Sequence, residues 1–327
     1  MRMLTLRPYA PADAAAWDAL VDRSRNGNFL HRRGYMDYHA DRYVDRSLVV
    51  ERGGEFVAVF PANVQDRAVT SHGGLTYAGL IASHALRAES TLALFEQIGN
   101  HYRAFGVERI VYKPVPHVFH AYPAEEDLYA LHRLGAQQTR RDLSSVISLQ
   151  ESFRFTPGRR RAVDKAKRAG IELQVGTELE GFHQLLCEAL RKHDTVPTHS
   201  VAELRLLQSR FPQHIVLHEA RRDGALLAGV LLYDFGHVVH TQYLAASAEG
   251  RRLDALSLLL AQLIEDTYAS RRHFSFGVST EQQGQVLNGG LVAQKEYFGA
   301  RAVVHDIYEW PLRRMLRRWK PRCWRPP

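Results

Sequence analysis

The segment from Tyr243 to Leu253 combines residue types that suit the binding of a diphosphate group. It is predicted to end a strand, pass through a short polar loop and begin an apolar helix. A helix start presents free backbone N–H groups and the positive end of the helix dipole, and both attract phosphate oxygens. An ordinary loop before a core helix is the alternative, because the glycine pair of a usual phosphate loop is missing. We predict cofactor contacts from the strand end, the loop and the helix start, namely Leu244, Ala245, Ser247, Gly250, Arg251 and Arg252.

A second polar cluster follows the next predicted strand, 273–278. The strand ends in a run that contains Glu281, and the helix after it carries Asn288 and Lys295. Loops at strand ends often carry catalytic groups, because the sheet holds them in place. We predict that partial burial tunes Glu281 for proton transfer and that Asn288 and Lys295 contact the cofactor. The alternative is that Asn288 caps the helix and Lys295 forms a surface ion pair.

Strands and helices are predicted to alternate along the first half of the chain. Apolar periodicity and turn residues place these elements at 4–7 (strand), 11–21 (helix), 47–50 and 56–64 (strands), 88–105 (helix), 109–112 (strand), 125–134 (helix) and 144–149 (strand). A basic helix follows at 154–169. It ends at Gly170, a residue type favoured just beyond helix ends.

The second half repeats this order of elements. They are predicted at 171–175 (strand), 179–192 and 201–209 (helices), 214–220, 225–232 and 238–245 (strands), 252–269 (helix), 273–278 (strand), 287–297 (helix) and 302–310 (strand). Ser200 is a candidate cap for the helix that begins at Val201. The similar order predicts an α/β (α+β) fold of two tandem domains, each with a mixed, mostly antiparallel sheet flanked by helices. The expected divisions are 1–150 for the first domain, 151–170 for a linker helix, 171–310 for the second domain and 311–327 for a basic tail.

The net charge of +8 comes from two local segments rather than from a general basic surface. Residues 154–168 and 311–327 each carry seven basic side chains, and the rest of the chain is slightly acidic. No apolar run reaches the roughly 18 residues that a membrane-spanning helix needs. Cys187 and Cys323 are too few and too far apart for a disulfide framework. We expect a cytoplasmic protein without nucleic acid as a general partner, in which Cys187 packs within a helix.

The basic tail has the spacing of an amphipathic helix. Leu312, Met315, Leu316 and Trp319 recur at helical intervals, with arginines between them. Such a helix can lie on an anionic membrane, so we expect peripheral contact with the inner face of the cytoplasmic membrane through 311–327. A solvated tail, or a helix packed on the domain, is the alternative.

Two sets of motifs carry a family resemblance. In the second half they are Gly277–Glu281, Leu287–Asn288, Gln294–Glu296 and Phe298–Arg301. In the first half they are Phe29–Arg32, Tyr38–His39, Phe60–Asn63 and Ser71–Ile81, and the basic helix Arg159–Gly170 is similar to a segment of Fem-type enzymes. Together they resemble GNAT-superfamily N-acyltransferases of the FemAB-like group. The resemblance implies transfer of an acyl group from acyl-CoA, without a metal, to a nucleotide-linked amino sugar for lipopolysaccharide or capsule biosynthesis.

In such a reaction an amine attacks the carbonyl carbon of a thioester and must lose a proton. Glu281 is the first candidate for the base, His240 the second and His193 the third, although a structural role is the alternative for each histidine. Tyr243 is the candidate for protonating the departing thiolate. A backbone N–H near Tyr243–Ala245 is expected to stabilise the charge on the carbonyl oxygen.

The first half is expected to bind the acceptor. We predict phosphate contacts from His31 and Arg32, and contacts with the sugar or base from Ser71, His72, Thr76 and Tyr77. The alternative for the glycine-rich segment is a tight connection between strands. Two other functions compete with the sugar acyltransferase. One is a Fem-type aminoacyl transferase dependent on transfer RNA, or a nucleic-acid-binding module, using the helix 154–168 and the tail; the other is a non-catalytic membrane-associated partner.

Overall fold

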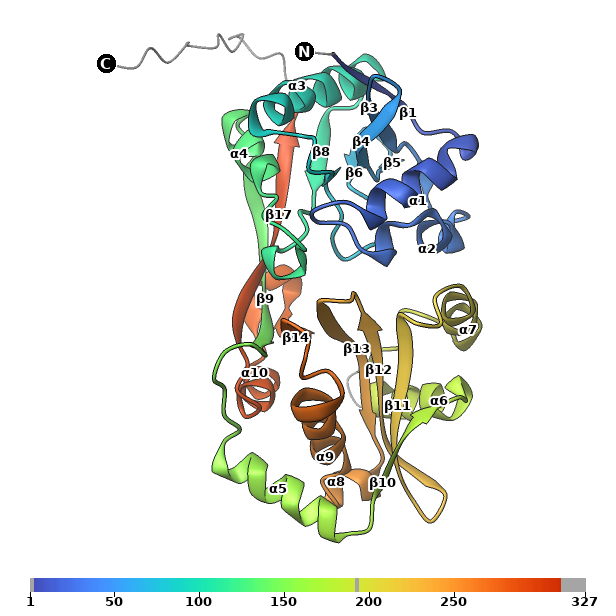
Figure 1. Cartoon of the computed structure of the whole chain (residues 1–327), viewed down its shortest axis with the longest axis vertical. Coiled ribbons are helices and arrows are strands. Elements are labelled where there is room, and N and C mark those ends of the chain that lie inside the picture. Colours follow the sequence, from blue (N-terminus) through green and yellow to red (C-terminus); the bar gives the residue numbers. More distant parts are fainter. Residues whose placement is uncertain (1–2, 192–193, 313–327) are drawn as a thin grey trace, which may run out of the picture.

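The computed structural model describes residues 3–191 and 194–312. Figure 1 shows two lobes along the long axis of the molecule, one built mainly from the first half of the chain and the other from the second half. Two long strands, β9 (Gln137–Ser148) and β17 (Arg301–Pro311), run between the lobes. β9 pairs with β14 of the second half, and β17 pairs with β8 of the first half, so each half contributes a strand to the other.

Within the described ranges, one sheet of eleven strands extends through both lobes. In order it contains β10 (Glu172–Gly176), β11 (Ile215–Arg222), β12 (Ala225–Asp234), β13 (Val238–Ala246), β14 (His273–Val278), β9, β17, β8 (Arg109–Tyr112), β6 (Ala68–Thr70), β5 (Asn63–Gln65) and β2 (Val44–Asp45). The β13–β14 and β6–β8 pairs are parallel, and the other neighbours are antiparallel. A second sheet contains β1 (Leu4–Pro8), β3 (Leu48–Arg52), β4 (Glu55–Phe60) and β7 (Ile81–Ala82). The predicted mixed, mostly antiparallel α/β architecture is confirmed.

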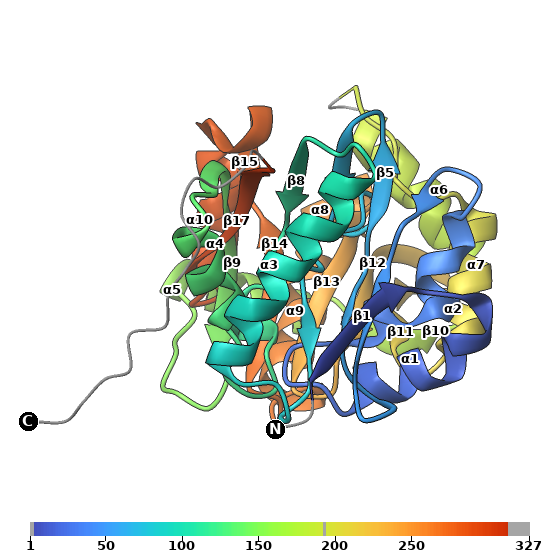
Figure 2. The ribbon, with the colours of Figure 1, turned by 90° about the horizontal axis from the view of Figure 1, so that it is seen from above.

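Helices cover both faces of the second-half sheet. One face carries α6 (Leu179–Arg191) and α7 (Val201–Arg210), and the other carries α5 (Pro157–Arg168), α8 (Ala248–Arg252) and α9 (Ala255–Gln262). Leu231 of β12 joins the first core and Leu232 joins the second, because successive strand residues point to opposite faces. The other helices are α1 (Ala14–Asp22), α2 (Arg33–Met36), α3 (Ala88–Ala104), α4 (Glu126–Arg133) and α10 (Gly289–Glu296). Figure 2 shows the first-half helices α1, α2 and α3 from above.

Two helix starts follow directly from the local sequence. Ser200 caps α7, and its hydroxyl accepts the N–H of Glu203 while the Glu203 carboxylate accepts the N–H of Ser200. Thr156 caps α5 through its hydroxyl, which accepts the N–H of Arg159 at 3.3 Å, and Pro157 occupies the first helical position. Both helices therefore lie close to the positions that the sequence predicts.

An apolar core joins the two lobes. The ring of Phe29 lies 5.3 Å from the ring of Phe211 and 5.4 Å from that of Tyr233. The hydroxyl groups of Tyr35 and Tyr233 are 3.2 Å apart. Because these aromatic side chains are buried in one cluster, the interface fixes how the halves sit on each other.

The long helix predicted at 252–269 is wrong as a single element. α8 begins earlier, at Ala248, and Asp254 separates it from α9 with a left-handed φ of 57°. The carboxylate of Asp254 accepts a hydrogen bond from the ammonium group of Lys165 at 2.7 Å. This bond holds the junction between α8 and α9 against α5. After α9 the chain forms a π-helical turn, Leu263–Thr267. Apolar spacing alone does not mark these interruptions.

The division of the chain into domains at 150 and 170 stays a prediction, since β9 and β17 connect the lobes. The amphipathic helix predicted for 311–327 falls, beyond Leu312, outside the described residues. Across 3–191 and 194–312, every helix is too short or too polar to cross a membrane.

Candidate active site

The parallel ladder between β13 and β14 ends early. It contains three residue pairs, Val238 with His273, Val239 with Phe274 and His240 with Ser275. Beyond them β14 pairs with β9 instead, and β13 continues along β12 through a register shift opposite Leu231 and Leu232. Among the described residues, the backbone groups on the β14 side of 241–246 therefore have no strand to pair with, and they are placed to hydrogen-bond an extended ligand. We call this gap between β13 and β14 the strand opening.

The predicted diphosphate contacts lie where β13 meets α8. Leu244 and Ala245 are on the unpaired part of β13. Ser247 caps α8, and its hydroxyl accepts the N–H of Gly250 at 2.9 Å. A Cβ on Gly250 would lie 1.9 Å from the carbonyl oxygen of Leu227. Gly250 is therefore required for close packing of α8 on β12, which is a different role from the predicted approach to a ligand.

Both arginines at the start of α8 have partners within the protein. Arg251 donates to the carbonyl oxygen of Ala246 at 2.6 Å. Arg252 lies 3.3 Å from the carboxylate of Glu249, which also pairs with Arg222 at 2.6 Å. Arg252 is well exposed and available to a bound anion, so its role as a cofactor contact stays a prediction.

His240 marks the point where the two strands separate. Its Nδ1 lies 3.0 Å from the hydroxyl oxygen of Ser275, and its ring packs edge-on against Phe119 at 6.0 Å. Gly277, with a φ of 75°, leaves room for this ring, because a Cβ there would lie 3.1 Å from His240 Cε1. Burial, reinforced by the nearby basic groups of His305 and Lys295, lowers the pKa of His240 to about 3. The imidazole is therefore neutral near pH 7, and it offers a ring nitrogen that can accept a hydrogen bond from an attacking amine.

Tyr243 of β13 forms a second pair with His199, which lies just before α7. The Tyr243 hydroxyl oxygen lies 2.7 Å from His199 Nδ1 and accepts the backbone N–H of His199 at 3.3 Å. The phenol hydrogen is thus free to donate to the ring nitrogen. Burial raises the pKa of Tyr243 and lowers that of His199 to about 4, so both groups are neutral near pH 7. No motif distinguishes His199 among the seventeen histidines, and sequence reasoning missed it.

Glu281 lies in a small hairpin of β15 (Thr280–Glu281) and β16 (Val286–Leu287). Its side chain is exposed, so the expectation of partial burial is wrong. The carboxylate accepts a hydrogen bond from the side-chain amide of Asn288 at 2.7 Å. Asn288 also caps α10 through the N–H of Leu291 at 2.9 Å. Asn288 therefore caps the helix, as the alternative interpretation expected. Its contact with a cofactor stays a prediction.

Lys295 is buried, with 4% of its surface exposed. Its ammonium donates to the carbonyl oxygens of Gly277 and Val278 at 2.8 Å and to the Ser279 hydroxyl at 2.6 Å. Burial lowers its pKa to about 8. The alternative of a surface ion pair is wrong, because Lys295 instead holds the end of β14 beside the strand opening.

Among the residues expected to bind the acceptor, Tyr77 is the one with contacts that lead to His240. Its ring stacks on Phe119 at 4.9 Å, and Phe119 contacts His240. Ser71 is buried and accepts the backbone N–H of Lys113 at 2.7 Å, which gives it a structural role. His72 is also buried and stacks on His39 at 5.1 Å, while Thr76 is exposed.

The phosphate contact predicted for His31 does not fit the structure. His31 is fully buried, its Nδ1 accepts the N–H of Asn28 at 3.1 Å, and burial lowers its pKa to about 4. A neutral core histidine cannot reach a bound phosphate. Arg32 forms an ion pair with Asp22 at 2.6 Å, on the helix α1. His193 lies outside the described residues.

Cys187 is half-buried on α6 rather than fully packed in the core. Its sulfur lies 3.6 Å from His183 Nδ1, and His183 Nε2 is 3.0 Å from the carbonyl oxygen of His199. Within the described residues, no three histidine, cysteine, aspartate or glutamate side chains are grouped so as to hold a metal ion.

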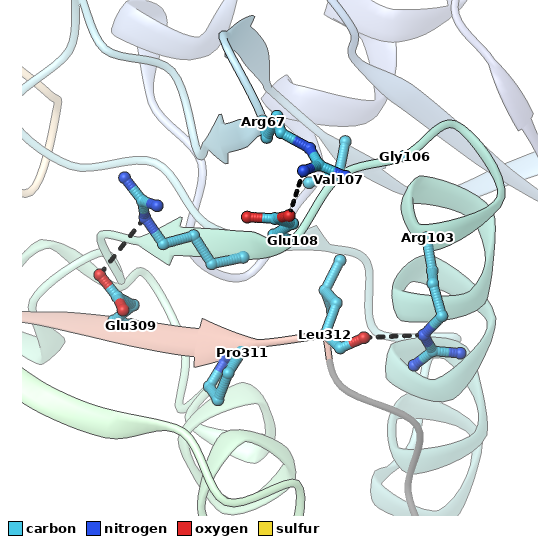
Figure 3. A pocket seen from close by; sticks show the side chains of 9 residues that line it. Arg67, Arg103, Gly106, Val107, Glu108, Glu309, Pro311 and Leu312 are labelled. Carbon is cyan, nitrogen blue, oxygen red and sulfur yellow. Dashed lines mark hydrogen bonds and ion pairs between the residues drawn. The ribbon is translucent and has the colours of Figure 1, made fainter.

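A polar hollow lies at the far end of the first lobe (Figure 3). Arg67 pairs with Glu108 at 2.6 Å, and Arg109 with Glu309 at 3.5 Å. Arg103 donates to the carbonyl oxygen of Leu312 at 2.9 Å. Arg67 and Arg109 are thus each paired with a carboxylate. The hollow lies away from β13 and β14, so it is not part of the candidate site.

Residues 158–283 match the acetyltransferase (GNAT) domain family. The chain has a GNAT-type acyltransferase fold. This match includes β13, β14 and α8, the elements that form the strand opening. A GNAT domain supports an enzyme of the N-acyltransferase type. No curated protein matches the sequence of the chain.

Solved structures resemble the whole chain at low sequence identity. FemX is 14% identical, with a TM-score of 0.67 over 94% of this chain and 97% of that protein. L-PGS from Bacillus licheniformis is 12% identical, with a TM-score of 0.62 over 95% and 94%. A tandem GNAT protein from the clavulanic acid biosynthesis pathway is 13% identical, with a TM-score of 0.52 over 96% and 100%. At these identities the similarity establishes the fold alone.

Proposed function

We propose that the chain is an N-acyltransferase that moves an acyl group from a coenzyme A thioester to the amine of an acceptor bound near the junction of the lobes. The observation that carries this proposal is the end of the β13–β14 ladder at His240 and Ser275. An extended pantetheine arm carries amide groups, and the unpaired backbone of 241–246 offers partners for them. The diphosphate would lie toward the capped start of α8, near Arg251 and Arg252.

His240 is the proposed base, in place of the exposed Glu281. The amine nitrogen forms a bond to the thioester carbon, its proton passes to neutral His240, and the carbon–sulfur bond breaks. Ser275 orients the imidazole through Nδ1. The departing thiolate takes up a proton, for which Tyr243 is the candidate donor because burial keeps its phenol protonated. Exchange with solvent then returns a proton to Tyr243 and removes one from His240. Lys295 fixes the end of β14, so that the opening keeps its shape.

A nucleotide-linked amino sugar is the proposed acceptor, for lipopolysaccharide or capsule biosynthesis. The family resemblance of the sequence motifs supports this choice. Tyr77 and Phe119 bring the first half against His240, as an acceptor site between the lobes requires. A cytoplasmic location with peripheral membrane contact through 311–327 belongs to the same proposal.

An aminoacyl transferase that depends on transfer RNA is the second candidate. Its support is the similarity to FemX and L-PGS over nearly the whole chain, together with the charge of α5. Arg160 and Lys165 of α5 pair with acidic groups, whereas Arg161, Lys167 and Arg168 are exposed. An exposed row of cations on one helix is suited to contact with phosphates of a nucleic acid.

Product detection by mass spectrometry separates the two candidates. The protein is incubated with a panel of acyl-CoAs and nucleotide-linked amino sugars, and in parallel with aminoacylated transfer RNA and the same acceptors. We expect an acylated amino sugar with the first donors and none with the second. Transfer from aminoacyl-tRNA alone, with steeply salt-dependent RNA binding, would replace the proposal with the alternative. His218→Gln, a substitution at a buried histidine of β11 that contacts Tyr268 at 3.0 Å, is the control for effects on folding.

A further inference from the structure

His305 is a buried histidine without a hydrogen-bond partner among the described residues. It lies on β17 directly opposite Asp142 of β9, and 8% of its surface is exposed. Neither Nδ1 nor Nε2 has a hydrogen-bond partner. A buried polar group without a partner is costly, and native proteins rarely keep one without a role. The ring therefore needs a partner that the described protein does not supply.

The position of His305 connects it with the proposed active site. Its ring lies 6.0 Å from the ring of Phe119, and the ring of His240 lies 6.0 Å from Phe119 as well. Tyr77 packs edge-on against His305 at 6.1 Å. His305 thus stands on the sheet at the junction of the lobes, separated from His240 by the ring of Phe119.

The same face of the sheet offers a second group without a partner. Ser144 lies two residues from Asp142 on β9 and is paired in register with Val303 of β17. Alternate residues of a strand point to the same face, so Ser144 and Asp142 share the face of His305. The Ser144 hydroxyl oxygen is buried and without a partner. Two groups that can donate and accept hydrogen bonds therefore lie along one face.

The chemistry of these groups selects the type of ligand. Burial lowers the pKa of His305 to about 4, so the ring is neutral near pH 7. A neutral imidazole offers one donor and one acceptor. A phosphate or carboxylate group only accepts hydrogen bonds, so it would leave the acceptor nitrogen of the ring without a donor. A hydroxyl or amide group can both donate and accept, so one such group can pair with either nitrogen, and two are needed to satisfy both.

We propose that His305 is a specificity-determining residue that binds an uncharged hydroxyl or amide group of the acceptor, close to the amine that reacts at His240. This inference rests on the proposed acyl transfer and assigns to His305 the recognition of an acceptor amine that carries hydroxyl or amide groups. An amino sugar meets that description. A simple alkyl amine does not.

Two ring amines test the inference, glucosamine with hydroxyl groups and cyclohexylamine without them. Acetyl-CoA is the donor, and release of free coenzyme A is followed. His305→Phe removes both nitrogens and keeps a planar ring, while His305→Gln restores one donor and one acceptor. We expect His305→Phe to lower kcat/KM for glucosamine about tenfold, as the loss of one or two net hydrogen bonds implies. The value for cyclohexylamine and the KM for acetyl-CoA should not change, and His305→Gln should recover part of the loss. Equal losses for both amines, or no loss, would overturn the inference.

Nuclear magnetic resonance of the imidazole nitrogens gives a readout that needs no turnover. Wild-type protein with ¹⁵N-labelled histidine is titrated with each amine, and His305→Gln identifies the resonance. The His305 nitrogens should shift with glucosamine and stay in place with cyclohexylamine, whereas those of His218 should not move. A shift without any acylation would uphold the recognition and reject the proposed function. Acylation of glucosamine with no shift would reject the recognition and leave the proposed function in place.

Discussion

His240 Nδ1 lies 3.0 Å from the Ser275 hydroxyl across the last residue pair that β13 and β14 share. The proposed base and the residue that orients it therefore stand at the point where the strand opening begins. This relationship ties the chemistry to the fold, because any change in the pairing of the two strands also moves the base.

His240→Ala should lower kcat by 10²- to 10⁴-fold, roughly the contribution of a general base. Ser275→Ala should have a smaller effect, about tenfold, because the imidazole remains but loses its orienting partner. Both are measured as the rate of coenzyme A release at saturating acceptor. Glu281→Gln is the matched comparison, and we expect it to stay within about twofold of wild type. A large loss in Glu281→Gln with activity retained in His240→Ala would return the base to Glu281.

Tyr243→Phe should loosen the segment before α7, because the hydroxyl holds His199 through two hydrogen bonds. We expect a loss of about 1 kcal/mol in the free energy of unfolding and faster hydrogen exchange at 194–200. His199→Ala should produce a smaller change at the same amides, because it removes the imidazole bond and keeps the bond from the backbone N–H. The double variant should lose little more than Tyr243→Phe alone, since that change already removes both bonds. Additive losses in the double variant would mean that the two residues act independently.

Gly250→Ala should destabilise the protein by about 1–3 kcal/mol, because the new methyl group would meet the Leu227 carbonyl oxygen and displace α8 from β12. Gly158→Ala is the matched control on α5, where nothing lies within 4 Å of an added Cβ. It should be neutral or slightly stabilising. Thermal unfolding compares the two. Equal stability of both variants would contradict the packing role assigned to Gly250.

Stability should fall as the pH drops from about 6.5 to 4. Among the described residues, burial lowers the pKa of six histidines to about 3 or 4, namely His31, His72, His199, His218, His240 and His305. In the unfolded chain these histidines take up protons near pH 6.5, whereas in the folded protein they stay neutral down to about pH 4. Acid therefore favours the unfolded state.

Asp127 and Asp18 act in the opposite sense, since burial raises the pKa of both, that of Asp127 to about 6, but they are two groups against six. Tm measured at intervals between pH 7 and 4.5 should decrease, and His218→Gln should reduce the slope. A Tm that is constant or rises over this range would contradict the assigned burial of the histidines.

Local signals predicted much of the fold. Ser200 with Glu203 marks the start of α7, and alternation of apolar residues marks the buried strands. Sequence could not indicate that β9 lies between β14 and β17, because that pairing joins segments more than a hundred residues apart.

The site residues were harder to predict for the same reason. His199 and His305 are selected by burial and by neighbours from distant segments, and no motif marks either of them. Glu281 ends a strand, as a catalytic residue often does, yet the hairpin that follows turns it outward to Asn288. Lys295 has the sequence context of a surface residue, and its burial depends on the carbonyl groups at the end of β14.

The crystal structure of the protein with acetyl-CoA tests the central claim most directly. The account predicts electron density for the pantetheine arm along 241–246, with the thioester carbon close to His240 and the diphosphate at the start of α8. Density for the coenzyme at any other surface, with the backbone of 241–246 left unpaired, would contradict it.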